Sequence, residues 1–159
     1  MTAPPRAEWS TTLTPPGDVA RKARMQVRTR LPLLGWWGDV ENAAQVASRL
    51  VDNAMTHGRD PDRPEWSLEL VLVMTAADEL IIAVQDTTPN FPDFAEIAHG
   101  PLPPHGTPER LSSLAWVRRD LAGRIACKTS PETGTKTVQV TLPAPAVALR
   151  QEALSRKGR

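Results

Sequence analysis

The sequence predicts an α/β (α+β) two-layer sandwich, in which a mixed, mostly antiparallel sheet carries three helices on one face. Two consecutive stretches near the N-terminus have apolar residues at helical spacing, and the next stretch alternates apolar and polar residues as strands do. After a long proline-rich segment, one more helical stretch precedes two further strands. A chain of 159 residues is the size of one such domain and can bury a core without disulfides or metals.

The first expected elements are a short edge strand over residues 9–13 and a helix that begins after Asp18. Aspartate is a favoured N-cap because its carboxylate accepts hydrogen bonds from the free backbone N–H groups of the first turn. The helix should end near Pro32, with its basic side chains opposite its apolar ones. The apolar positions are Ala20, Ala23, Val27 and Leu31.

A second helix should begin at Asp39, after a Gly-Trp-Trp-Gly turn, and end near Gly58. We expect Trp36 and Trp37 to pack together beneath the start of this helix. The apolar stripe consists of Val40, Ala43, Ala47, Leu50 and Ala54.

Beyond residue 66 the pattern changes from helical spacing to alternation, which predicts an antiparallel hairpin with one buried face. Its first strand covers residues 66–74, and its second contains Leu80, Ile82 and Val84. A turn over residues 76–79 connects the two strands.

Residues 87–107 hold five prolines and two glycines, which predicts a loop long enough to act as a lid or a binding segment. A third helix should follow, capped by Thr107 with Pro108 at its first position. The closing strands are expected over residues 124–129 and 136–142.

Composition excludes several classes of function. With 19 basic and 18 acidic residues the net charge is +1, so no overall field favours nucleic acid or an anionic membrane as partner. The single cysteine, Cys127, rules out an internal disulfide and is expected to be a small apolar strand residue. We expect a cytoplasmic domain over residues 9–143, with a flexible tail at 1–8 and a basic tail at 144–159.

Two features could carry chemistry. Arg49, Asn53 and His57 lie at i, i+4 and i+8 on one flank of the second helix, where they could line a pocket or simply border the core. Asp86 is in phase with the apolar residues of its strand and should point toward the buried side. A buried carboxylate needs a donor, which a ligand N–H could supply. Alternatively, the strand ends at Gln85 and Asp86 begins the loop.

Three segments together resemble the GHKL (Bergerat-fold, histidine-kinase-like) ATP-binding proteins, especially the actinobacterial anti-sigma-factor serine/threonine kinases. Residues 50–58 (LVDNAMTHG) resemble the N box of that family, and residues 85–89 (QDTTP) occupy the place of its adenine-binding box. Residues 134–138 (GTKTV) resemble its closing glycine-threonine motif. The order and spacing agree over residues 9–143.

The resemblance implies a nucleotide site built from Asn53, His57, Asp86 and Thr137. Asn53 would coordinate Mg²⁺, a hard cation that prefers oxygen ligands. Asp86 would accept a hydrogen bond from the adenine amino group, and Thr137 would support the adenine from a neighbouring strand. ATP or ADP with Mg²⁺ would then be the cofactors, bound weakly or no longer bound.

The sequence departs from the family at two places. Arg49 stands where the family has its general-base glutamate, and arginine cannot take a proton at working pH. Ser112 and Ser113 replace the glycines of the phosphate-binding segment, which removes the close backbone approach that lets N–H groups cradle phosphates. No catalytic residue is therefore expected.

These observations lead to three functional hypotheses. The first is a partner-switching regulator that binds a sigma factor, a STAS-type anti-anti-sigma antagonist or both, with weak or absent kinase activity and a possible homodimer. The second is an active serine/threonine kinase in which Asp52 or Glu109 supplies the base. The third is a protein-binding module that retains only the fold.

Overall fold

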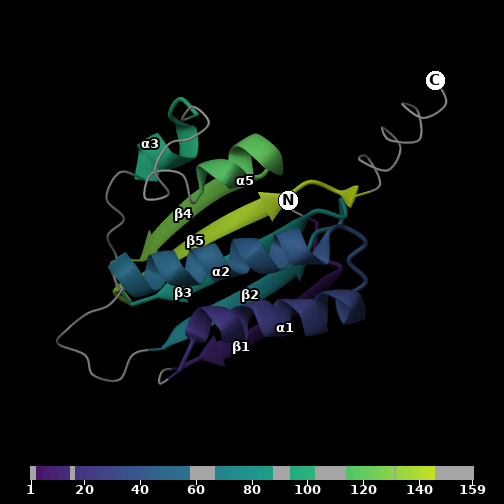
Figure 1. The fold of residues 1–159 in the computed structure, drawn as a ribbon, viewed down its shortest axis with the longest axis horizontal. Helices are drawn as coiled ribbons and strands as arrows, with labels where there is room; N and C mark the ends of the chain where they lie inside the picture. Colours follow the sequence, from purple (N-terminus) through teal and green to yellow (C-terminus); the bar gives the residue numbers. More distant parts are fainter. Residues whose placement is uncertain are drawn as a thin grey trace.

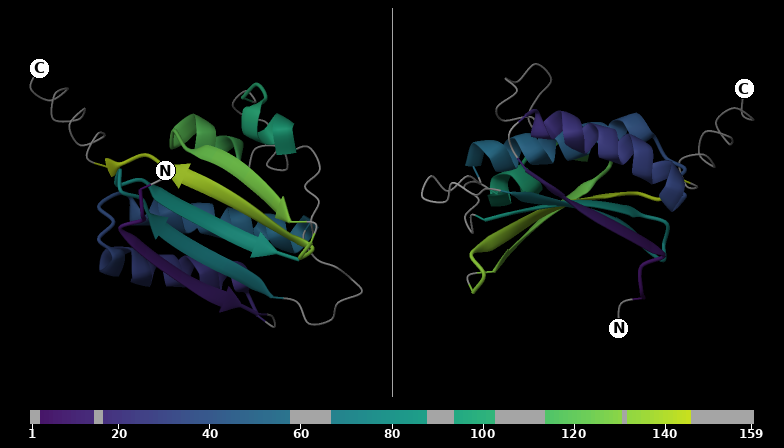
Figure 2. Two further views of the ribbon diagram at one scale, coloured as in Figure 1. Left: turned by 180° about the vertical axis from the view of Figure 1, so that it is seen from behind. Right: turned by 90° about the horizontal axis from the view of Figure 1, so that it is seen from below.

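The computed structural model describes residues 3–14, 17–57, 67–87, 94–102, 114–130 and 132–145. These residues form a five-stranded sheet in the order β1-β2-β3-β5-β4, with helices packed on one face (Figures 1 and 2). The elements are β1 (Ala7–Leu13), α1 (Val19–Leu34), α2 (Val40–His57), β2 (Leu68–Met74), β3 (Leu80–Asp86), α3 (Phe94–His99), α5 (Ala115–Asp120), β4 (Arg124–Ser130) and β5 (Thr135–Leu142).

The expected two-layer α+β class is confirmed. We expected a mixed, mostly antiparallel sheet, and each of the four strand pairings in the described residues is antiparallel. β5 lies between β3 and β4, so the last strand in the described part of the chain is an inner strand of the sheet. This insertion brings the start of β5 beside the end of β3.

Aspartate caps begin both long helices as expected. Asp18 Oδ1 accepts a hydrogen bond from the Arg21 N–H at 3.0 Å, and Asp39 Oδ1 accepts one from the Asn42 N–H at 2.9 Å. α1 runs past Pro32 only as far as Leu34, so the proline, which lacks an N–H donor, lies in the last turn of the helix. The helix stops only where Gly35 takes a left-handed φ of 82°.

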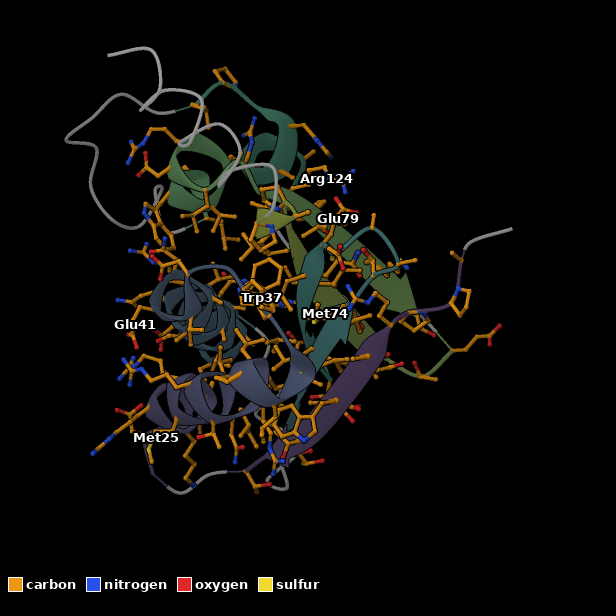
Figure 3. The ribbon with its side chains drawn as sticks, turned by 90° about the vertical axis from the view of Figure 1, so that its right-hand side faces the viewer. Met25, Trp37, Glu41, Met74, Glu79 and Arg124 are labelled. Atoms are coloured by element: carbon orange, nitrogen blue, oxygen red, sulfur yellow. The ribbon has the colours of Figure 1, made fainter. Side chains whose placement is uncertain are left out.

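The two tryptophans in the turn between α1 and α2 differ in their exposure to solvent. Trp36 is buried, with 8% of its surface exposed, whereas Trp37 is 83% exposed (Figure 3). The expectation that both rings pack beneath the start of α2 is therefore wrong for Trp37. The Trp36 ring lies so close to Gly38 that a Cβ there would sit 2.5 Å from a ring carbon.

Part of the segment expected to be an irregular loop is helical. α3 is one and a half turns long and packs near β4, as does α5. The expected cap at Thr107 lies outside the described residues, and within them α5 begins at Ala115, with Leu114 at its N-cap position. The role of residues 87–107 as a lid stays a prediction.

Candidate functional site

The motif residues gather where α2, β3 and β5 meet. α2 packs on both strands, and its C-terminal half lies over the end of β3 and the beginning of β5 (Figure 1). Asp86 is the last residue of β3 and is 2% exposed, in phase with the buried residues of that strand. The prediction that its side chain faces the helix layer is confirmed, and the alternative that the strand ends at Gln85 is wrong.

The chain itself supplies a countercharge for this buried carboxylate, although Asp86 Oδ2 accepts no hydrogen bond from the described residues. Lys136 lies directly opposite Asp86 in the β3–β5 ladder, and its Nζ is 3.2 Å from Asp86 Oδ2. The two side chains are 0% and 1% exposed, respectively. Removing each ion of such a pair from water costs several kcal/mol. Either charge is therefore tolerated in the core only when the opposite charge is beside it.

Lys136 is the residue of the candidate site that sequence reasoning missed. Side chains alternate between the faces of a strand, and on β5 the buried positions are Lys136, Val138, Val140 and Leu142. A lysine in phase with three apolar residues was a signal for a buried cation. Thr137 is half-buried, lies opposite Gln85 and so points to the other face of the sheet from Asp86.

One flank of α2 faces α5, which lies on the same face of the sheet (Figure 2). The guanidinium carbon of Arg49 lies 4.7 Å from the centroid of the Trp116 ring, a cation–π contact that joins α2 to α5. Asn53 is half-buried one turn further along the same flank, toward the end of α2 that overlies Asp86. The His57 side chain lies outside the described part of the chain, as do Ser112 and Ser113.

The opposite flank of α2 faces α1. Arg24 Nη1 donates a hydrogen bond to Ser48 Oγ at 2.8 Å, and Arg28 forms an exposed two-point ion pair with Glu41. Partial burial raises the pKa of Asp52, and the Asp18 carboxylate raises it further, against the attraction of Arg24 and Arg49. Asp52 thus shares its electrostatic surroundings with the start of α1.

Cys127 lies on β4 beside the buried ion pair. It is half-buried and opposite Val138, and burial raises the pKa of its thiol, with Lys136 opposing and Asp86 adding to the effect. The thiol is therefore protonated at neutral pH and is a poor nucleophile. Its expected role as a small apolar strand residue agrees with this setting.

Two absences hold for the residues covered by the structure. They contain no group of three or more His, Cys, Asp or Glu side chains arranged to hold a metal ion. Among their helices, none has the length and apolar character required to cross a membrane.

No protein-family model matches the sequence, and no curated protein matches it. The chain is similar to the crystal structure of the RsbU and RsbW domains of Rv1364c from Mycobacterium tuberculosis, with a TM-score of 0.56 and 17% identity. This match covers 86% of the chain but only 32% of that structure's chain.

The chain is also similar to the histidine kinase domain from the Erythrobacter litoralis EL346 blue-light activated histidine kinase. The TM-score is 0.49 at 16% identity, over 67% of this chain and 48% of that one. The chain thus spans less than half the length of either structure. At 17% identity the likeness to the Rv1364c structure is one of fold alone, and it agrees with the fold expected from the three motifs.

Proposed function

We propose that this chain is a regulatory, anti-sigma-factor-like domain that binds a sigma factor, a STAS-type antagonist or both, with weak or absent kinase activity. The observation that carries the proposal is Arg49 stacked on Trp116. A kinase of the family that the motifs resemble needs a proton acceptor at this position, and arginine stays protonated at any working pH. The choice of partner class is supported by the three motifs and by the fold shared with an RsbW domain.

The rival hypothesis of an active kinase needs another base. Asp52 is separated from Asn53 by about 100° around the α2 axis, given 3.6 residues per turn. Burial raises the pKa of Asp52, which Asp18 raises further and Arg24 and Arg49 lower, so it is the direction of Asp52 from the helix that argues against a role beside Asn53. Glu109, the other candidate base, lies outside the described residues.

The test uses the full chain with sigma factors and STAS-domain proteins from the same genome. We expect a stable complex with at least one of them, and no labelled phosphate on either partner after incubation with labelled ATP and Mg²⁺. Phosphate transfer at a rate typical of protein kinases would overturn the non-catalytic part. Binding to none of these proteins would overturn the partner class and favour a module that retains only the fold.

A second test addresses Arg49 itself. Arg49→Glu should raise any residual phosphate transfer, whereas Arg49→Gln, which removes the same charge without adding a base, should not. Equal transfer by the two variants would show that position 49 does not hold the base.

A further inference from the structure

The buried ion pair occupies the position that the fold would use to read a nucleotide base. Asp86, Lys136 and Ser48 are the buried polar or charged residues in the described part of the chain, and Lys136 is the bulkiest of its fully buried side chains. On β5 it stands at the end of an otherwise apolar inner face. The pair lies at the junction of α2, β3 and β5, so it belongs to the candidate site rather than to a remote part of the core.

Lys136 places a positive charge 3.2 Å from the carboxylate oxygen to which, by the resemblance, an adenine amino group would donate. An ammonium has three N–H donors and a full positive charge, so it is a stronger partner for a carboxylate than a neutral amino group. With 1% of its side chain exposed, Asp86 presents almost no surface to a ligand. A base could reach it only by displacing Lys136, which would leave a buried ammonium without its carboxylate, and that is costly.

We infer that Lys136 is a built-in substitute for the base amino group, which closes the adenine position from within and makes partner binding independent of adenine nucleotides. The described residues therefore do not fit an adenine base at Asp86. The inference takes Asp86 as the base-reading position that the resemblance implies, and only its consequence for partner binding rests on the proposed function. It assigns Lys136 as the residue that decides whether this fold accepts a nucleotide.

A purely structural ion pair would make a different prediction. If Lys136 only stabilised the core, its removal would weaken the fold without creating affinity for adenine. If Lys136 takes the place of the adenine base, its removal should expose the Asp86 carboxylate so that adenine can bind there. Stability alone does not separate the two explanations, whereas ligand binding does.

The experiment measures binding of adenosine and of ADP with Mg²⁺ by calorimetry and by the shift in Tm. Adenosine isolates the base position because it carries no phosphate. The proteins are the unaltered chain, Asp86→Asn, Lys136→Thr, and Lys136→Thr combined with Asp86→Asn. Lys128→Thr is the matched control, because Lys128 is an exposed lysine of β4 opposite Thr137.

We expect no adenosine-dependent heat or Tm shift in the unaltered chain or in Lys128→Thr. Lys136→Thr should have a lower Tm and bind adenosine at least about tenfold more tightly than the unaltered chain, a change of ~1.4 kcal/mol. Addition of Asp86→Asn should abolish the gain.

Two results would overturn the inference. One is adenosine binding by the unaltered chain that is lost in Asp86→Asn. The other is a folded Lys136→Thr variant without any gain in binding. If Lys136→Thr does not fold, Lys136→Met replaces it, and the titration of the unaltered chain still decides the first of these results. None of these readouts involves a protein partner, so a failure of the proposed function would leave them interpretable.

Discussion

Lys136 and Asp86 show how two residues that are each costly to bury can be stable as a pair. Their side chains are 0% and 1% exposed, and 3.2 Å separates Nζ from Oδ2. Removing one partner of a buried ion pair leaves the other charge without compensation in a medium of low dielectric. Replacing both partners with neutral groups leaves no uncompensated charge.

We therefore predict strong coupling between the two positions. Lys136→Met alone should lower the free energy of unfolding by about 3–5 kcal/mol, because a buried carboxylate then lacks its cation. The double variant Lys136→Met with Asp86→Asn should lose less than the sum of the two single variants. Urea unfolding of all four proteins at pH 7 measures this cycle, and additive effects would contradict the pairing.

Asp52 gives a prediction about pH. Its pKa in the folded protein is raised above the ordinary value of 3.8, mainly by burial. A raised carboxyl pKa means that the ionised form disfavours folding. The favourable contribution is complete only below the unfolded pKa and is lost as the pH rises through the folded pKa.

Asp52→Asn should accordingly raise stability at pH 7 slightly, by about a few tenths of a kcal/mol because solvent screens this exposed site. The advantage should disappear as the pH falls below the ordinary aspartate pKa. Urea unfolding at pH 7 and at acidic pH gives the comparison, with Asp120→Asn, an exposed aspartate of α5, as control. A loss of stability at pH 7 would show that Arg24 and Arg49 dominate instead.

At the level of elements, the turn between α1 and α2 buries Trp36 and leaves Trp37 exposed. Gly35 ends α1 in a left-handed conformation, after which Trp36 packs inward beside Gly38 and Trp37 projects from the surface (Figure 3). Neighbouring residues in a turn point in different directions, so a shared residue type did not imply a shared environment.

We predict that the two tryptophans differ sharply in their effect on stability. Trp36→Ala should cost about 3–5 kcal/mol, because it leaves a cavity beneath the start of α2. Trp37→Ala should change stability by less than about 0.5 kcal/mol, as is usual for exposed positions. Thermal unfolding of both variants measures the difference. Similar losses would mean that Trp37 is covered in solution.

At the level of the whole molecule, the candidate site and the exposed Trp37 lie at opposite ends of the sheet (Figures 1 and 3). The motif residues lie where α2 and β3 end and β5 begins (Figure 1), whereas Trp37 and the 2.9 Å Arg124–Glu79 ion pair lie at the opposite end (Figure 3). A nucleotide could influence a partner across this fold only if it bound one state of the protein better than another.

Because Lys136 closes the base position, we predict that adenine nucleotides do not regulate the complex. The affinity for a captured sigma factor or STAS-domain protein should change by less than about twofold with ADP or ATP, since a ligand without differential affinity shifts no equilibrium. Calorimetric titration of the partner with and without nucleotide tests this directly. A larger change that disappears in Asp86→Asn would contradict it.

Local patterns in the sequence were enough to place most of the fold. The spacing of apolar residues predicted α1 and α2, and alternation predicted the strands and the inward direction of Asp86. Capping chemistry predicted that Asp18 would begin α1. These features depend on residues close together in the chain, so they can be read without knowing which elements become neighbours.

What only the tertiary structure decided was which distant side chains meet. The pairing of Asp86 with Lys136 depends on the insertion of β5 beside β3, and the Arg49–Trp116 contact depends on where α5 packs. Alternation along β5 could have shown that Lys136 is buried, but not that Asp86 faces it. Sheet order and strand register arise from the packing of the whole core, and a period-two pattern carries no information about them.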